Sequence, residues 1–120
     1  NASPVHTLPE ITKLAKLFPE NIECVIVVMG GKAAAGALLY KTHSVTRTQY
    51  MASDEEGRKI GALDLVLEHS IQRAREAGFR HFDLGTSSLE QGKILNQNLY
   101  QFKTEFGAGG AVFEQFQIAL

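Results

Sequence analysis

The sequence predicts an α+β fold built on a mixed sheet, and three observations lead to this prediction. Two apolar segments flank Gly30-Gly31, a pair typical of a tight hairpin. A long helical pattern begins at Ile60, and a short alternating segment, 80–84, follows it. A strand reached through a helix of this length runs most easily parallel to the strand before it. The expected order is therefore helix, antiparallel three-strand meander, helix, strand, helix and strand.

The first predicted element is an amphipathic helix. Thr7-Leu8-Pro9-Glu10 places a hydroxyl three residues before a carboxylate, with proline in the first turn, which is typical of a helix start. Apolar residues then recur at helical spacing up to Phe18. Pro19 ends the pattern.

The meander follows. The run 24–29 is rich in β-branched residues and does not alternate, which predicts a strand covered on both faces. Gly30-Gly31 supplies the positive φ angles of a two-residue turn, so 33–42 returns antiparallel to it. Gly36 suggests a bulge in this second strand. A third strand, rich in Thr, Val and Tyr, is expected at 45–51.

The second half of the chain begins with a polar segment, 53–59, which reads as a turn. The helix from Ile60 ends at Gly78, a typical C-terminal glycine. Its apolar stripe is wide because it includes Ala62, Leu65 and Val66, so we expect this helix to be packed within the body of the domain.

The remaining elements complete one predicted domain over residues 1–120, without repeats or linkers. They are a strand at 80–84, a helix at 94–106 and a final strand at 112–118.

Composition excludes several classes of function. Twelve Lys and Arg residues against thirteen Asp and Glu leave a net charge of -1, which argues against a DNA-binding domain and makes a tRNA partner unlikely. The longest apolar run is strand-sized, far below the roughly 20 residues of a membrane span. The single cysteine, Cys24, fits a reducing, cytoplasmic location and is expected to be a small buried apolar residue. The four histidines show no metal-ligand spacing, so no metal is expected.

The first candidate site is Gly57-Arg58-Lys59-Ile60-Gly61-Ala62, where the chain enters the long helix. Unpaired N–H groups and the positive dipole end at a helix start bind phosphates, and Arg58 and Lys59 add positive charge. The alternative is an ordinary helix start with two solvated basic residues. The spacing matches neither a Walker loop nor a dinucleotide fingerprint.

The second candidate site follows the strand at 80–84. Asp83 and the hydroxyls of 86–88 lie at its C-terminal end, the side on which open α/β sheets bind ligands. The next helix carries Asn96, Tyr100 and Lys103. The alternative is that these groups cap backbone atoms in the loop and helix, and that Tyr100 packs its ring.

Taken together, these segments resemble the GNAT acyltransferases, and more narrowly their bacterial branch related to the FemAB peptidyl transferases. The resemblance covers residues 8–118 and is carried by the segments 54–63, 77–87, 96–99 and 102–108. The string Phe82-Asp83-Leu84-Gly85-Thr86-Ser87-Ser88 is part of its most specific pattern. It implies a GNAT-like sheet whose parallel strands, 45–51 and 80–84, splay apart around the arm of acetyl-CoA or another acyl-CoA. Gly57, Arg58, Lys59, Gly61 and Ala62 would then bind the pyrophosphate.

The activity implied is N-acyl transfer from acyl-CoA to an amine of a small molecule or a cell-envelope precursor. Such catalysis rests on holding donor and acceptor together and on polarising the carbonyl. Asp83 is the candidate general base and Tyr100 the candidate general acid. Ser87, Asn96 and Lys103 are the candidate acceptor-binding residues.

One departure from the family pattern leaves alternatives open. Leu63 stands where the pyrophosphate turn has a small residue. The alternatives are a Fem-like transferase that uses aminoacyl-tRNA and a binding or assembly module with degenerate catalysis. Asn1-Ala2 resembles the remnant of a cleaved tag, so the chain is expected to be part of a longer protein. A homodimer is compatible with the sequence.

Overall fold

The computed structural model describes residues 4–114 and 116–119. Its contacts divide the chain into two compact units, Asn1–Gly85 and Thr86–Leu120, and each is described by itself.

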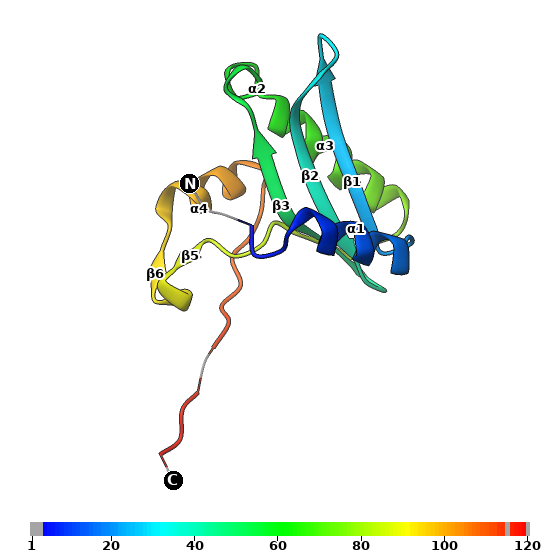
Figure 1. Cartoon of the computed structure of the whole chain (residues 1–120). Coiled ribbons are helices and arrows are strands. Elements are labelled where there is room, and N and C mark those ends of the chain that lie inside the picture. Colours follow the sequence, from blue (N-terminus) through cyan, green and yellow to red (C-terminus); the bar gives the residue numbers. More distant parts are fainter. Residues whose placement is uncertain (1–3, 115, 120) are drawn as a thin grey trace. The chain divides into compact units, whose positions relative to one another are not determined.

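The first unit is built on a four-stranded mixed sheet (Figure 1). Its strands follow the order of the chain, with β1 and β2 antiparallel, β2 and β3 antiparallel, and β3 and β4 parallel. The strands are β1 (Ile22–Met29), β2 (Lys32–Lys41), β3 (Val45–Ser53) and β4 (His81–Asp83). The predicted α+β class, the meander and the parallel fourth strand are confirmed.

The two longer helices of this unit lie on opposite faces of the sheet, as Figure 1 shows. The long helix α3 (Ala62–Glu76) packs on β1, β2 and β3 and buries Val66 and Leu67 almost completely. The helix α1 (Leu8–Leu17) contacts β1 across the other face. The core lies between α3 and the sheet and consists of Ala34, Ala35, Ala37, Leu39, Ala62 and Val66.

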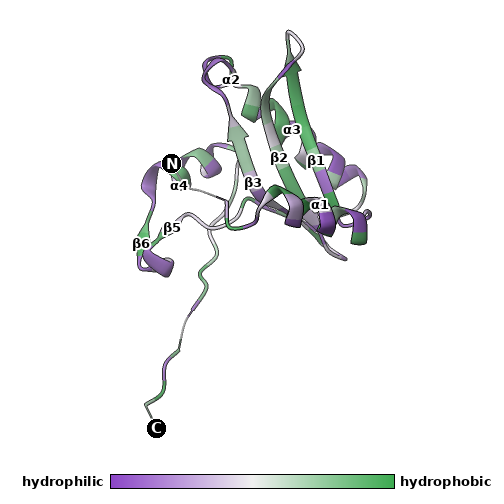
Figure 2. Cartoon of the chain, in the orientation of Figure 1, coloured by the Kyte–Doolittle hydropathy of each residue, from purple (hydrophilic) through white to green (hydrophobic). Residues whose placement is uncertain are grey.

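Three expectations about burial are wrong, two of them because only one face of β1 packs against α3. Val25 and Val27 contact the core, but Ile26 and Val28 are 55% and 57% exposed on the opposite face. Cys24 shares that face and is exposed. Figure 2 shows β1 as a hydrophobic strand, which explains why its sequence suggested cover on both sides. The long helix likewise has one buried face, and Leu65 is exposed.

The expected bulge at Gly36 is also wrong. Gly36 pairs regularly with Ile26, and the register of this hairpin shifts between Val27 and Val28 instead. A Cβ on Gly36 would lie 3.1 Å from the Ile26 side chain and 3.2 Å from the Val25 carbonyl. Glycine therefore allows close approach of the two strands here.

The expected turn at 53–59 contains a short helix, α2 (Glu55–Lys59), and α3 begins at Ala62 rather than Ile60. Asp54 caps α2 by accepting the Gly57 N–H at 2.6 Å. Gly61 then separates the two helices because it adopts a left-handed conformation, φ +67°. The sequence pattern of 60–76 did not reveal this break.

The start of α1 is as predicted. Thr7 caps the helix, and its N–H and hydroxyl both donate to the Glu10 carboxylate, at 2.6 and 2.8 Å. These hydrogen bonds lower the pKa of Glu10, so the cap contributes stability above the ordinary carboxyl pKa and loses it as the pH falls through the lowered value.

The second unit contains a small hairpin and a helix. Its elements are β5 (Ser88–Leu89), a 3-10 turn at Glu90–Gly92, β6 (Ile94–Leu95) and α4 (Gln97–Glu105). The helix expected from Ile94 begins only at Gln97, because Ile94 and Leu95 pair with β5 and Asn96 caps the helix.

The final strand predicted at 112–118 is wrong for the residues described, 112–114 and 116–118, which form no strand. Val112, Phe113, Phe116 and Ile118 are 78% to 87% exposed. Apolar alternation favours a strand only where a neighbouring strand can pair with it, and this segment pairs with none in the described part of the chain.

The contact between α2 and β2 predicts a large effect of Gly57→Ala. A Cβ on Gly57 would lie 2.2 Å from the Ala34 carbonyl oxygen and 2.7 Å from the Ser53 hydroxyl. Because backbone must move to relieve this overlap, we expect a loss of about 3 kcal/mol in the free energy of unfolding, measured by urea denaturation. Gly109→Ala is the control, since nothing lies within 4 Å of a Cβ there, and it should change stability by less than about 0.5 kcal/mol. Equal effects of the two substitutions would contradict this account.

Candidate acyl-transfer site at the end of a parallel strand pair

The pairing between β3 and β4 is short. It comprises Val45 with His81, Thr46 with Phe82, and Arg47 with Asp83. Beyond Arg47, β3 continues to Ser53, and no strand pairs with this edge in the described part of the chain. The edge therefore has backbone donors and acceptors that the sheet does not use.

The direction of these donors follows from the register. Ser53 pairs with Ala35, and the next residue, Asp54, donates its N–H to the Ala34 carbonyl at 2.9 Å. In an antiparallel ladder the N–H groups of alternate residues face opposite sides, so Ser53 and Met51 direct theirs away from β2, toward the unpaired edge. A register shift between Leu38 and Leu39 lies just before this stretch. Such bulges are common beside functional sites.

Asp83 lies at the last paired position and is already engaged. One carboxylate oxygen accepts the Gly85 N–H at 2.7 Å, and the other lies 3.4 Å from the Arg47 guanidinium. The Thr48 hydroxyl also donates to the Asp83 carbonyl, at 3.4 Å. The side chains of Arg47 and Asp83 remain 42% and 37% exposed, so a ligand could reach the carboxylate.

The start of α3 offers N–H groups that no side chain caps. Gly61 is its N-cap, and the first bond within the helix runs from the Asp64 N–H to the Gly61 carbonyl, at 3.0 Å. The N–H groups of Ala62 and Leu63 precede that bond. Leu63 itself packs against the core, so the larger residue at this position does not project into the turn. Asp64 places a negative charge in the first turn, which opposes anion binding.

The other residues of the predicted phosphate site have structural partners. Gly57 is buried, and its N–H is used by Asp54. The Arg58 guanidinium donates to the Ser53 carbonyl at 2.7 Å, which links the turn to the unpaired edge of β3. Lys59 pairs with Glu55 at 2.9 Å, but both side chains are more than two-thirds exposed. A pair this exposed contributes little stability and leaves Lys59 available to a ligand.

The predicted residues of the second unit also make structural contacts. The Asn96 side chain accepts the Leu99 N–H at 3.1 Å, and the Asn96 N–H donates to the Ser87 carbonyl at 2.8 Å. Lys103 is buried and donates to the Thr86 carbonyl at 2.6 Å. Tyr100 is 42% exposed, and its hydroxyl would lie 3.6 Å from a Cβ on Gly110. The capping role considered for this region is present for Asn96.

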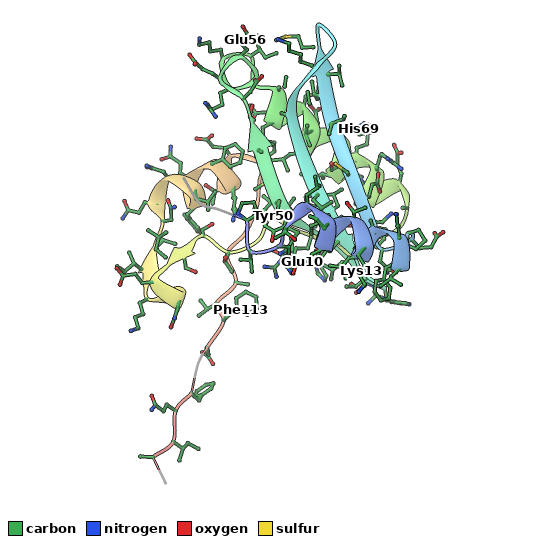
Figure 3. The ribbon with its side chains drawn as sticks, viewed as in Figure 1. Glu10, Lys13, Tyr50, Glu56, His69 and Phe113 are labelled. Carbon is green, nitrogen blue, oxygen red and sulfur yellow. The ribbon has the colours of Figure 1, made fainter. Side chains whose placement is uncertain are left out.

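Sequence reasoning missed a set of polar side chains on the sheet face opposite α3. Tyr40 and Arg47 are cross-strand partners, and Tyr50 lies on the same face further along β3. The Tyr40 hydroxyl and the Arg47 Nε are buried without a hydrogen-bond partner. The Tyr50 hydroxyl contacts His6, 44 residues away (Figure 3). Alternation within β2 and β3 could have placed the tyrosines on one face, but no sequence signal identified His6.

The described residues contain neither a metal-binding cluster nor a membrane-spanning helix. No cluster of three or more His, Cys, Asp or Glu side chains that could bind a metal ion occurs among residues 4–114 and 116–119. Within the same ranges, none of the helices combines the length and the hydrophobicity that crossing a membrane requires.

The sequence and the fold were compared with known proteins. The sequence matches a family described as "Acetyltransferase (GNAT) domain" over residues 2–103. No curated protein matched. The fold resembles a ribosomal-protein-alanine N-acetyltransferase from Brucella melitensis, with 11% identity, a TM-score of 0.62, and coverage of 84% of this chain and 72% of that one.

Two further solved structures are similar. One is an aminoglycoside acetyltransferase from an uncultured soil metagenomic sample in complex with sisomicin, with 15% identity, a TM-score of 0.64, and coverage of 97% and 78%. The other is an acetyltransferase from Trypanosoma brucei, with 17% identity, a TM-score of 0.63, and coverage of 100% and 84%. At these identities the likeness establishes a shared fold.

The unpartnered Tyr40 hydroxyl predicts an alkaline effect on stability. Burial, with a smaller effect of the Tyr50 charge, raises the pKa of Tyr40 above its ordinary value of 10.0. The unfolded chain therefore releases this proton at lower pH than the native protein, and stability falls as the pH rises above about 10. Tyr40→Phe removes the hydroxyl and should reduce this loss in urea denaturation at pH 9 to 11. At neutral pH the variant should be as stable as the wild type or more stable by about 1 kcal/mol. A large loss at neutral pH would contradict the absence of a partner.

Proposed function

Because the chain belongs to the GNAT acetyltransferase family, we propose that it transfers an acyl group from acyl-CoA to the amine of a small molecule or a cell-envelope precursor. The observation that carries this proposal is the unpaired edge of β3, where Met51 and Ser53 direct N–H groups away from the sheet. Preorganised backbone donors of this kind stabilise the oxyanion that develops when an amine attacks a carbonyl.

Acyl-CoA, most simply acetyl-CoA, fits the donor role and supplies a reactive thioester. The uncapped N–H groups of Ala62 and Leu63 at the start of α3 suit its pyrophosphate, together with Gly61 and the charges of Arg58 and Lys59. Since Arg58 is hydrogen-bonded to the Ser53 carbonyl, the phosphate-binding turn and the unpaired edge of β3 are linked within the first unit. Gly57 supports this turn by allowing α2 to lie close to β2.

For the proton transfers we propose the two residues that the sequence singled out. Asp83 would act as general base, directly or through a water molecule. Its hydrogen bond from Gly85 and its pairing with Arg47 hold the carboxylate in one orientation. Tyr100, partly exposed on α4, would act as general acid toward the departing thiolate. Ser87, Asn96 and Lys103 would shape the acceptor side through the loop and helix that they stabilise.

The acceptor is proposed to be a primary amine. One structural relative is named for acetylating aminoglycosides and another for acetylating a protein alanine, so the fold serves both small and large amines. The near-neutral net charge of this chain favours a small acceptor over tRNA. Leu63, the departure that raised the Fem-like alternative, is partly buried and packs against the core, and we propose that it is compatible with an acyl-CoA donor.

Binding of the donor is tested by thermal denaturation with acetyl-CoA. A ligand that binds only the native state raises the midpoint in proportion to the logarithm of its concentration. We expect Arg58→Ala to require roughly tenfold more acetyl-CoA for the same shift, since a charge-assisted contact to phosphate is lost. Lys16→Ala, which removes a charge on α1, is the control and should behave as the wild type. No shift of the wild type at millimolar acetyl-CoA would exclude this donor.

Catalysis is tested by following thiol release from acetyl-CoA in the presence of spermidine, glycinamide or sisomicin. Asp83→Asn and Tyr100→Phe should each lower kcat about 100-fold or more, the range expected when a general base or acid is lost. Neither change should greatly alter acetyl-CoA binding. If both variants retained the kcat of the wild type, the roles of Asp83 and Tyr100 would be wrong, although the transferase activity would stand.

A further inference from the structure

A long-range contact of the first unit joins His6 to Tyr50, 44 residues apart. The backbone N–H of His6 donates to the Tyr50 hydroxyl oxygen at 3.2 Å, and the imidazole Nδ1 lies 2.6 Å from the same oxygen. The two rings meet edge to face, with their centroids 6.1 Å apart. Both residues are partly buried, and Figure 3 shows Tyr50 near the start of α1.

The backbone contact has a fixed direction, and the direction of the imidazole contact follows the tautomer of His6. The backbone N–H of His6 can only donate, so the Tyr50 oxygen accepts it. In the neutral tautomer that carries its proton on Nε2, the Tyr50 O–H donates to Nδ1. The Tyr50 oxygen then keeps one lone pair, which can accept a hydrogen bond from a third group.

Tyr50 occupies a position next to the proposed oxyanion donors. It lies on β3 beyond the last residue paired with β4 and directly precedes Met51, whose N–H faces the unpaired edge. Its side chain is on the sheet face opposite α3, the face that also carries Arg47, the partner of Asp83. An amine that attacks a carbonyl bound at this edge would approach along a sheet face.

We propose that the Tyr50 hydroxyl binds the acceptor amine and that His6 sets the direction of that hydroxyl. This inference rests on the proposed transferase function and adds a positioning residue on the acceptor side. With His6 neutral, the free lone pair of Tyr50 accepts an amine N–H. The arrangement selects a nitrogen that carries a hydrogen and holds it beside the backbone donors.

Protonation of His6 reverses this arrangement. Nδ1 then carries a hydrogen and donates to Tyr50, which already accepts the backbone N–H, so the Tyr50 proton must point outward. An outward O–H would face the amine N–H donor to donor, so the two groups would form no hydrogen bond. Near His6 lies Glu10 on α1, whose carboxyl pKa is lowered mainly by hydrogen bonds from Thr7 and to a smaller extent by the His6 charge. Arg47 lies on the same sheet face as Tyr50, three positions earlier on β3. Tyr40 on β2 also senses the Tyr50 charge. Amine binding should therefore be weaker when His6 is protonated than when it is neutral.

The competing interpretation is that the pair only attaches the N-terminal segment to the sheet. That role would lower the stability of variants without changing how the amine binds. The conservative variant His6→Asn separates the two interpretations, because the asparagine side chain has an oxygen acceptor in place of Nδ1 and does not titrate. The chain also provides a matched control, Tyr40, a tyrosine on the same face whose hydroxyl is unpartnered.

The test measures KM for the amine and kcat from pH 5.5 to 8.5, with spermidine, glycinamide and sisomicin as acceptors. We expect Tyr50→Phe to raise KM roughly tenfold at pH 8 with a smaller change in kcat, and Tyr40→Phe to change neither. The KM of the wild type should rise as the pH falls, whereas His6→Asn should keep the high-pH KM across the range. Melting temperatures of all variants report the structural role separately.

Three results would overturn the inference. One is a Tyr50→Phe variant with a lower melting temperature but an unchanged KM. Another is an acid-side rise in KM that persists in His6→Asn. The third is a nitrogen NMR spectrum that places the neutral His6 proton on Nδ1, because the hydrogen bonds would then run the other way whatever the activity. Absence of turnover by the wild type with every amine would instead reject the proposed function, on which the inference depends.

Discussion

The fold depends on the unequal length of two parallel neighbours. β3 pairs with β4 over three residues and then continues to Ser53 with β2 as its strand partner among the described residues. A strand that pairs along only one edge retains N–H groups that the sheet does not use, and such groups are normally paired or covered. Here the free edge begins at the Arg47–Asp83 pair and ends at Ser53, whose carbonyl is bound by Arg58. This stretch of the β3 edge thus lies between two arginines, Arg47 in the strand itself and Arg58 hydrogen-bonded to the Ser53 carbonyl.

Small residues allow α2 and α3 to pack closely on the sheet beside the β3 edge. Ala34, Ala35 and Ala37 form the part of β2 that faces α3, and Gly57 lets α2 approach the Ala34 carbonyl. Larger side chains at these positions would separate the helices from the sheet and move the start of α3 away from β3. The sheet face opposite α3 is less well covered, since α1 does not bury Ile26 or Val28. That face holds the polar residues Tyr40, Arg47 and Tyr50. His6 of the N-terminal segment contacts the Tyr50 hydroxyl there.

The chemistry proposed for the first unit needs no unusual side chain. Backbone donors, a helix start and one oriented carboxylate are sufficient for acyl transfer when they are held in place, because the reaction gains most from approximation and from stabilising the oxyanion. Residues of the second unit, Asn96 and Lys103 among them, stabilise their own loop and helix.

Local sequence determined the elements whose causes are local. The Gly30-Gly31 turn, the capping box at Thr7 and Glu10 and the period of α3 predicted the order of the meander and helices, because turn, cap and stripe act over a few residues. Tertiary structure decided the rest. Which face of β1 is covered, whether 112–118 finds a partner, and where β3 separates from β4 depend on neighbours distant in the chain. The contact of His6 with Tyr50 spans 44 residues, and a local pattern carries no information about a hydrogen bond that only folding brings together.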